Sequence, residues 1–256
     1  MQVMPLLIVV LTAFYATASV TQTFANRGTT PAGWDFVLKE NKGTVDQVSD
    51  VVYGNSSTAI EVTQTYTPGY TGRYHSEVHH FQGYHRGEEG FYGFAFRLQD
   101  DWQFCPAQSY NIGQFIADFT DTGCDDWMPA SMVWIIGNQL ATRVRTGSVC
   151  KQRTTEFKNL ASVSAGDWHE VVIQASWQND DTGFYKLWFD GVEVLEKLNI
   201  ATTIDDARNF EFHVGLYANG WHDDGGMKGS QPFRQAWYAQ IAIGTTFADA
   251  DPDQWS

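Results

Sequence analysis

The chain has 256 residues, of which 43% are hydrophobic and 15% aromatic, and its formal net charge at pH 7 is −14. This composition can build a large core, and all-β domains of roughly 200–250 residues often fold as one unit. The excess of acidic residues argues against non-specific binding to nucleic acids or membranes, so we expect neither kind of partner. We also expect a monomer.

The first residues predict a secretory signal peptide. Residues 5–15 form a short apolar run, and the small residues 16–18 follow it as a cleavage site, although no Lys or Arg precedes the run. The run is shorter than the ~18 apolar residues that a membrane span needs. We expect residues 1–18 to be removed, which leaves one secreted, extracellular domain over residues 19–256.

Strand patterns recur along the rest of the chain, whereas the apolar spacing that a helix requires is nearly absent. Asp190 and Gly191 predict a two-residue hairpin turn between two of the strands. So many antiparallel strands predict an all-β fold of two packed sheets, a sandwich or jelly roll. The expected strands are residues 34–39, 58–65, 74–80, 91–97, 111–119, 131–136, 141–146, 169–177, 184–189, 192–196, 210–218 and 237–243.

Three cysteines cannot all pair, and secretion favours one disulfide. If the strands expected between residues 111 and 146 form a meander, Cys124 and Cys150 lie at the same end of it. We therefore predict a Cys124–Cys150 disulfide and a free Cys105. Residues 55–57 (Asn-Ser-Ser) are an N-glycosylation sequon, which predicts a glycan on a surface loop.

The strand expected at residues 210–218 has the clearest alternation in the chain. Its even positions are apolar and its odd positions are polar or glycine, so one face is buried and the other carries Glu211, His213, Tyr217 and, just beyond the strand, Asn219. A glycine in mid-strand often marks the close approach of a ligand or another backbone. The polar face is either the floor of a binding cleft or an ordinary solvent-exposed face.

The strand expected at residues 74–80 has the same character. Alternation places His75, Glu77 and His79 on one face, with Arg73 two residues upstream on that face. Histidine and glutamate are also metal ligands. Positions two apart on a strand are separated by about 7 Å, however, which suits a long groove better than a coordination sphere.

Two further strands could add polar groups to this face. Gln114 lies among apolar residues that would point to the core, and a lone glutamine on a strand is usually an ordinary surface residue. Arg143 and Arg145 share one face of their strand within residues 143–158, which hold five cations and one acid. This basic stretch either binds an anionic ligand or consists of scattered solubilising charges.

These segments resemble three strand motifs of the alginate-lyase-type polysaccharide lyases, in the same order along the chain. The motifs read Arg-Thr/Ser-Glu-Leu-Arg, Gln-Ile/Val-His and Tyr-Phe-Lys-Ala-Gly-Val-Tyr-Asn-Gln, and this chain has residues 75–79, 114–116 and 211–219 in their place. Residues 167–195 look like the middle of jelly-roll lyases and concanavalin-like domains. The mature chain as a whole is similar to the fungal glucuronan lyases, polysaccharide lyase family 20.

The resemblance implies a concanavalin-like β-jelly roll with a concave cleft, and a lyase that cleaves β-1,4-linked polyglucuronate, an anionic polysaccharide, as an endo-glucuronan lyase does. In this β-elimination the C5 proton is removed, the C4–O4 bond breaks and an unsaturated uronate forms. The chain departs from the alginate motifs at two positions. His75 stands in place of Arg, and Ile116 stands in place of a catalytic His, so the base assignment of the alginate enzymes does not transfer.

The resemblance also implies residue roles. Gln114 and His75 would neutralise the uronate carboxylate, helped by Arg73. Tyr217 would be the acid, or both acid and base, and His75 could be the base instead because an unperturbed imidazole pKa near 6.5 suits neutral chemistry. The substrate-binding residues would be Arg73, Glu77, His79, Arg143, Arg145, His213, Asn219 and Trp134, the last of which either stacks on a sugar ring or lies in the core.

A structural Ca²⁺ is also implied, with Glu40 and Asn55 as candidate ligands because hard cations prefer carboxylate and carbonyl oxygens. The sequon at Asn55 competes with this role. Two rival functions remain. A glycoside hydrolase on the same fold needs two carboxylates around the bond, yet the glucanase pattern Glu-x-Asp-x-x-Glu is absent from the sequence. A non-catalytic lectin would explain the fold but not the Tyr, His and Gln on one face.

Overall fold

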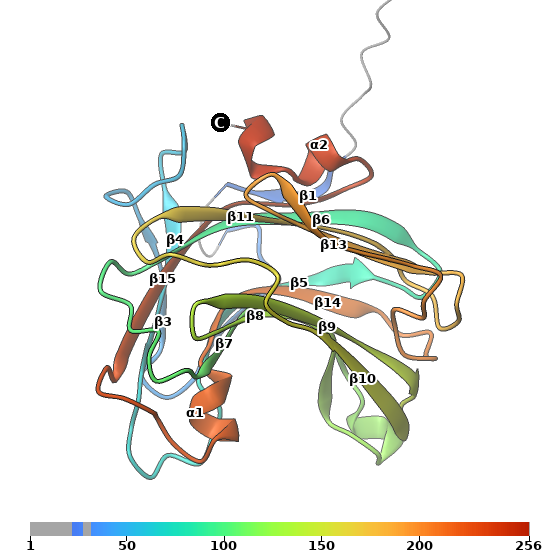
Figure 1. The fold of residues 1–256 in the computed structure, drawn as a ribbon, viewed down its shortest axis with the longest axis horizontal. Helices are drawn as coiled ribbons and strands as arrows, with labels where there is room; N and C mark the ends of the chain where they lie inside the picture. The colour runs from blue at the N-terminus through green and yellow to red at the C-terminus, as the bar shows by residue number, and fades with distance from the viewer. Residues whose placement is uncertain (1–21, 28–31, 256) are drawn as a thin grey trace, which may run out of the picture.

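Two antiparallel β-sheets pack face to face in the computed structural model, which describes residues 22–27 and 32–255 (Figure 1). This confirms the predicted all-β jelly roll. The predicted signal peptide, residues 1–18, lies outside the described residues. Within the described part of the chain, no helix has both the length and the apolar character needed to cross a membrane.

The first sheet has eight strands. In spatial order they are β13 (Val192–Leu198), β12 (Phe184–Phe189), β11 (Trp168–Ser176), β6 (Glu89–Leu98), β15 (Phe233–Gly244), β4 (Ala59–Thr65) and β3 (Thr44–Val48), with β1 (Gln22–Asn26) also paired to β15.

The second sheet has seven strands and is curved, with its concave face turned away from the first sheet (Figure 1). In spatial order they are β10 (Lys151–Phe157), β9 (Gln139–Ser148), β8 (Trp127–Ile136), β7 (Ser109–Asp118), β14 (Phe210–Tyr217), β5 (His75–Tyr84) and β2 (Phe36–Lys39). The short helical segments are η1 (Thr120–Thr122), α1 (Asn219–Asp223), α2 (Phe247–Ala250) and η2 (Pro252–Trp255).

Each of the twelve expected strands corresponds to a strand of the structure, whereas β1, β3 and β10 were not predicted. The sequence of β10 is Lys-Gln-Arg-Thr-Thr-Glu-Phe, and most of its residues are exposed. It forms the edge of the second sheet beyond β9. A strand without a buried face has no apolar alternation, so the pattern that identifies the other strands is missing here.

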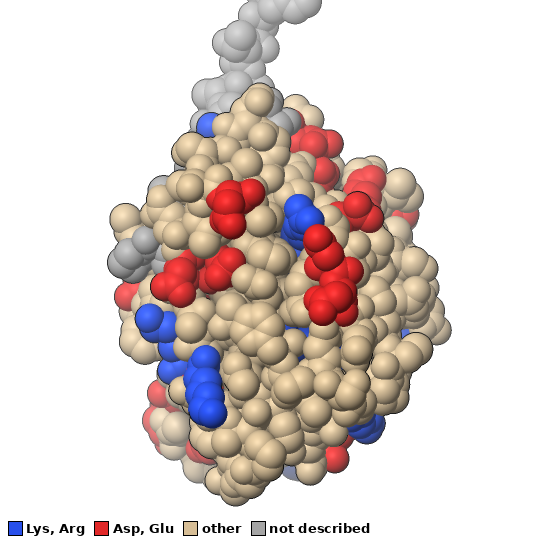
Figure 2. Space-filling model, turned by 90° about the vertical axis from the view of Figure 1, so that its left-hand side faces the viewer, with Lys and Arg blue, Asp and Glu red and all other residues tan. Residues whose placement is uncertain are grey.

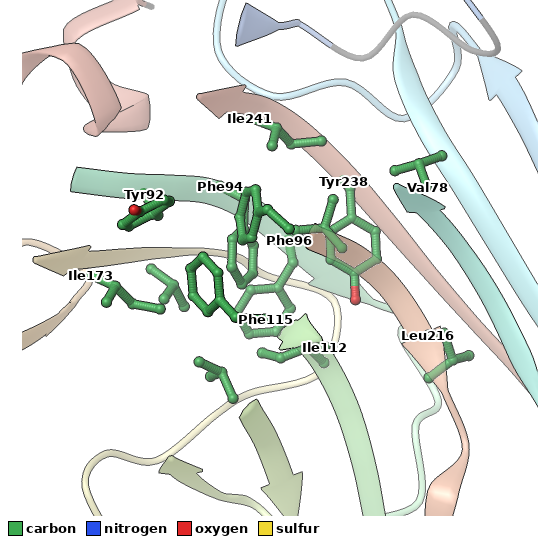
Figure 3. Close-up of a cluster of buried hydrophobic side chains, with 14 of the residues drawn as sticks. Val78, Tyr92, Phe94, Phe96, Ile112, Phe115, Ile173, Leu216, Tyr238 and Ile241 are labelled. Atoms are coloured by element: carbon green, nitrogen blue, oxygen red, sulfur yellow. The ribbon is translucent and has the colours of Figure 1, made fainter. Parts of the chain in front are cut away.

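The hydrophobic core fills the space between the two sheets (Figure 3). The even residues of β14 point into it as predicted, because Phe210, Phe212, Val214 and Leu216 are each at most 1% exposed. The ring of Phe212 stacks on that of Phe115 from β7, with centroids 5.0 Å apart. With this face of β14 buried, the odd residues are turned to the concave face of the sheet.

The glycine in the middle of β14 is required by a close approach of two backbones. Gly215 has φ +145°, and a Cβ at this position would lie 2.3 Å from the carbonyl oxygen of Ser76 and 2.6 Å from Cα of Glu77. The prediction that this glycine marks a close contact is confirmed, and the neighbour is the backbone of β5. The strand can therefore pass directly beside Glu77.

The Cys124–Cys150 disulfide is present, and Cys105 is free and exposed, as predicted. The bond joins the segment after η1 to the turn between β9 and β10. Asn55 of the sequon is exposed in the loop between β3 and β4, where a glycan would be accessible.

Candidate active site

A groove with a volume of about 930 Å³ crosses the concave face of the second sheet. The helix α1 borders it on one side, and the segment at the start of β8 together with β9 borders it on the other (Figure 1). The site residues expected from the sequence that line it include His75, His79, Gln114, Arg143, His213 and Tyr217. The predicted convergence of His75, Gln114 and Tyr217 in one trough therefore agrees with the geometry.

The register of the strands brings these residues together. In the antiparallel pair β5–β14, Tyr217 is opposite His75, and their rings stack with centroids 3.8 Å apart and 13° between the planes. His213 is opposite His79 in β5 and opposite Gln114 in β7. Neighbours across an antiparallel sheet lie on the same face, so one row of functional groups crosses three strands.

The phenol of Tyr217 is arranged as a proton donor. The pKa of Tyr217 is raised to about 12, first by burial and then by the negative charge of Asp223. The guanidinium of Arg73 lowers the pKa but does not cancel this increase. Arg73 donates a hydrogen bond to the Tyr217 Oη. Nη1 of Arg73 also lies 3.8 Å from Oδ1 of Asp223, the last residue of α1. Because the Tyr217 oxygen accepts this hydrogen bond from Arg73, the hydrogen of the protonated phenol is free to be donated to a group bound in the groove.

Glu77 lies at the bottom of the groove, where its side chain has no exposed surface. Its side chain is fully buried, its Oε2 lies 2.6 Å from Nδ1 of His75, and its oxygens accept hydrogen bonds from Nε2 of Gln114 at 3.0 and 3.1 Å. Burial alone would raise the pKa of Glu77, but interaction with His75, including their hydrogen bond, and smaller contributions from His213 and His79 lower it to about 2. Glu77 therefore lines the groove as predicted, and its substrate contact stays a prediction, since the side chain is buried and bonded to its protein neighbours.

The imidazoles of His79 and His213 form a neutral stacked pair with ring centroids 3.3 Å apart and 9° between the planes. Burial is the main reason that the pKa of each is lowered to about 3. Nε2 of His213 lies 2.7 Å from Oε2 of Glu211, whose pKa is itself raised to about 7, chiefly by burial. Both rings line the groove as predicted.

Glu77, His79 and His213 also form a possible metal-binding cluster, since one ligand atom of each lies within 4.8 Å of the others. Two imidazoles and one carboxylate suit a transition metal and not Ca²⁺, which prefers six to eight oxygen ligands. The lone pair of an imidazole nitrogen lies in the plane of its ring. Because the two rings are stacked in parallel, their lone pairs run side by side, and one ring would have to turn before both could bind one ion.

The two residues expected to hold Ca²⁺ do not lie together. Glu40 lines the groove, and its Oε2 accepts a hydrogen bond from the backbone N–H of His75 at the start of β5. In the hairpin of β3 and β4, Glu40 lies before the first residue of β3, whereas Asn55 lies in the loop at the opposite end, between β3 and β4. A single ion shared by Glu40 and Asn55 does not agree with this placement.

Arg143 and Arg145 line the groove, as Arg73 does, while Lys151, Arg153 and Lys158 of the same basic stretch as Arg143 and Arg145 do not. Burial, and then repulsion by Arg145, lowers the pKa of Arg143 to about 10, so it stays charged. Its Nε has no hydrogen-bond partner among the described residues. A half-buried cation without such a partner is suited to binding an anionic ligand.

On the flank of the molecule in Figure 2, acidic and basic groups are interspersed.

The tryptophan expected to stack on a sugar is buried. Trp134 is 6% exposed and packs with Met132 and Ala141 in a small cluster apart from the main core. Three exposed aromatic residues line the groove instead. They are Trp127 at the start of β8, which is 50% exposed, Phe36 at 49% and Phe81 at 41%. None of the three was predicted from the sequence, because the polar alternation that identified the other groove residues does not include them.

Asn219 joins the groove wall at the start of α1, as expected. Its Oδ1 accepts hydrogen bonds from the backbone N–H of Asn111 and the hydroxyl of Ser109, so α1 is fixed to β7. Asp223, at the end of the same short helix, also lines the groove and was missed. A five-residue helix has too few positions to show helical periodicity in a sequence.

A jelly roll whose concave face combines a protonated phenol, neutral imidazoles and available guanidinium groups defines a carbohydrate-active protein for acidic sugar chains. A model of the polysaccharide lyase family matches residues 25–242, and the chain belongs to this family. No match is found among curated proteins.

Among solved structures, the chain is similar to an endo-β-1,4-glucuronan lyase from the fungus Trichoderma reesei. The two are 59% identical, with a TM-score of 0.89 over 91% of this chain and 100% of that one. An alginate lyase from Aplysia kurodai has 7% identity and a TM-score of 0.57, over 88% of this chain and 100% of that one. One from a Chlorella virus has 10% identity and a TM-score of 0.56, over 84% and 93%. These two share the fold alone.

Proposed function

We propose that the protein is an endo-acting glucuronan lyase, which cleaves β-1,4-linked polyglucuronate by β-elimination. The 59% identity to a glucuronan lyase supports the choice of polymer. The observation that carries the chemistry is the side-by-side placement of His75 and Tyr217 on the groove floor. An imidazole and a phenol stacked at 3.8 Å present a base and an acid to the same side of a bound sugar.

The stereochemistry of the substrate matches this arrangement. In the chair form of β-D-glucuronate, H5 is axial and O4 is equatorial, so the two lie on the same side of the C4–C5 bond. The base that removes H5 and the acid that protonates O4 must therefore act from one side. His75 and Tyr217 are neighbours on adjacent strands of one face and meet this requirement.

The reaction assigns one task to each group. Nε2 of His75 takes H5, the electrons of the C5–H bond form the C4=C5 double bond, and the C4–O4 bond breaks. Tyr217 gives its proton to O4, which leaves as a hydroxyl group of the next sugar. The raised pKa of Tyr217, about 12, keeps the phenol protonated at neutral pH and so favours the role of acid.

Negative charge develops beside the uronate carboxylate when H5 is removed, and neutral or cationic donors stabilise it. Gln114 is a neutral donor that lines the groove, opposite His213 in the strand pair β7–β14. Arg143 and Arg145 would bind carboxylates of neighbouring sugars, for which a planar guanidinium is suited. Arg73 holds Tyr217 in place and adds positive charge at the same end of the groove.

A panel of glucuronan, alginate and pectate tests the proposal. The elimination product has a double bond conjugated to its carboxylate, so a lyase raises the ultraviolet absorbance, and we expect the largest rate on glucuronan. New reducing ends without absorbance would indicate a hydrolase. Binding with neither signal would indicate a lectin. Both of these outcomes would contradict the proposal.

Four further properties belong to the same proposal. Residues 1–18 act as a signal peptide, the secreted domain of residues 19–256 is a monomer, Asn55 carries a glycan, and a structural Ca²⁺ is bound. The exposed position of Asn55 supports the glycan. Amino-terminal sequencing of the secreted protein, its mass before and after deglycosylation, and its melting temperature with and without a chelator would test them.

A further inference from the structure

One buried carboxylate contacts both of the groups that the proposed reaction places around the sugar. Glu77 is fully buried, and its Oε2 lies 2.6 Å from Nδ1 of His75. Both of its oxygens accept from Nε2 of Gln114, at 3.0 and 3.1 Å. The carboxylate on β5 thus joins an imidazole on its own strand to an amide on β7.

An ionised carboxylate can only accept hydrogen bonds, so it decides which atom each partner turns towards it. Nδ1 of His75 must carry the proton that Glu77 accepts. Nε2 of the neutral ring is then the nitrogen with a free lone pair. The stacking on Tyr217 fixes the plane of the same ring. Together the two contacts fix both the tautomer and the orientation of the proposed base.

The amide of Gln114 is oriented by the same rule. Its nitrogen faces Glu77, because its carbonyl oxygen would be repelled by the carboxylate. The second N–H of this amide is left to donate a hydrogen bond elsewhere. In the proposed reaction its acceptor is the uronate carboxylate, where negative charge develops.

The space and the hydrogen-bond partners around Glu77 both suit a carboxylate at this position. Gly215 leaves room for it, since a Cβ there would lie 3.1 Å from Cγ of Glu77. Nδ1 of His213 and Nε2 of His79 lie 3.9 and 4.0 Å from Oε2 of Glu77. Neither of these nitrogens has a hydrogen-bond partner among the described residues. The direct hydrogen bonds of Glu77 therefore go to His75 and Gln114, the two groups assigned to the substrate.

We propose that Glu77 is a positioning residue of the lyase reaction, which holds His75 in the Nδ1-protonated tautomer and turns the Gln114 amide towards the substrate carboxylate. This inference rests on the proposed function. Because the Glu77 side chain has no exposed surface, we expect its loss to lower kcat more than it raises KM.

The variant Glu77→Gln keeps the size of the side chain but replaces an acceptor with an amide that also donates. We expect kcat on glucuronan to fall roughly 10²–10⁴-fold, the range for a misoriented general base, with KM little changed. The matched control is Glu170→Gln on β11 in the other sheet, where Glu170 accepts a hydrogen bond from Tyr53. The control should keep the wild-type kcat and KM. A wild-type kcat for Glu77→Gln would overturn the proposal.

Nitrogen-15 NMR of the histidine rings reads the tautomer without turnover, with the His75 signals assigned by their loss in His75→Gln. In the wild type we expect the neutral ring to be protonated on Nδ1, and in Glu77→Gln we expect this preference to be lost. A wild-type ring protonated on Nε2 would overturn the proposal. The expected tautomer in a protein that eliminates no uronate would overturn the proposed function instead.

A shorter carboxylate provides the test if Glu77→Gln does not fold. Glu77→Asp keeps the charge but lacks one methylene, so it cannot reach His75 and Gln114 together in the observed geometry. We expect its kcat to fall at least about tenfold, in line with a partly misplaced base. An unchanged kcat in Glu77→Asp, with a normal melting temperature, would contradict the proposal.

Discussion

The rings of His75 and Tyr217 stack face to face with centroids 3.8 Å apart and 13° between their planes. The two residues are direct partners in the antiparallel pair of β5 and β14, so their relative position is set by backbone hydrogen bonds and not by loops. Functional groups on rigid strands are held more precisely than groups on loops. The pair therefore holds an imidazole and a phenol side by side on the floor of the groove.

Removal of the phenolic hydroxyl should stop the reaction and leave the fold intact. In Tyr217→Phe the ring remains to stack on His75, but no proton is available for O4. We expect kcat to fall roughly 10²–10⁴-fold, the usual contribution of a general acid, with a melting temperature close to that of the wild type. The rate of ultraviolet absorbance increase measures the loss, and Tyr70→Phe, outside the groove, is the control. A near-normal rate would remove Tyr217 from the mechanism.

Arg143 should contribute to binding more than to chemistry. It lies on β9, lines the groove and lacks a partner for its Nε among the described residues. A hydrogen bond to a charged group contributes about 1.5–3 kcal/mol, so Arg143→Ala should raise KM about 10- to 100-fold. Arg153→Ala is the control, since Arg153 belongs to the same basic stretch but is exposed on β10. A loss of kcat at constant KM would indicate a role in the chemical step instead.

Period-two alternation predicted most of the groove floor. It placed His75 and His79, and separately His213 and Tyr217, on polar faces, and the register of β5 with β14 brings these faces together. Alternation cannot distinguish an exposed side chain of the groove from one that its neighbours cover. Glu77 is on the correct face, yet the imidazoles around it bury it completely. Depth below the surface depends on the packing of neighbouring strands, which a single sequence does not contain.

The choice of tryptophan shows the same limit. Trp134 lies in the middle of β8, where it packs with Met132 and Ala141. Trp127 lies at the first residue of β8, before the strand that the sequence predicted. The register of β8 with β7 also shifts near Ile116, which breaks the regular alternation. A bulge of this kind leaves no clear mark in the sequence, so the exposed ring could not be assigned to the groove.

The two tryptophans should therefore respond differently to substitution. Trp127→Ala should raise KM for long substrates by about two- to tenfold, since aromatic stacking contributes about 0.5–1.5 kcal/mol, and it should barely change the melting temperature. Trp134→Ala should instead destabilise the fold by about 3–5 kcal/mol, as expected for a buried tryptophan. Steady-state kinetics and thermal melts on the two variants separate these effects. A KM effect confined to Trp134→Ala would show that Trp127 does not bind the polymer.

The buried imidazoles of the groove floor should make the fold sensitive to acid. The pKa of His79 and of His213 is lowered to about 3, mainly by burial, whereas an imidazole in the unfolded chain titrates at about 6.5. Between these values the unfolded chain binds two protons that the folded protein does not. The free energy of unfolding should therefore fall as the pH is lowered from about 6.5 towards 3.

Two carboxyl groups modify this dependence. Glu77, with its pKa lowered to about 2, stabilises the fold above the unfolded value of about 4.3, and this stability is lost as the pH falls towards 2. Glu211, with its pKa raised to about 7, acts in the opposite direction, because between about 4.3 and 7 the folded state keeps a proton that the unfolded state has released. Two imidazoles outweigh this single carboxyl group, so stability should still rise between about pH 4.5 and 6.5.

Melting temperatures across this range, compared between the wild type and the double variant His79→Asn/His213→Asn, test the assignment. Asparagine does not titrate, so the variant should lose the increase in stability towards neutral pH. Glu211 should then reverse the local trend, because its opposing contribution is no longer outweighed. Equal slopes for the two proteins would mean that the stacked pair does not control the acid sensitivity of the fold.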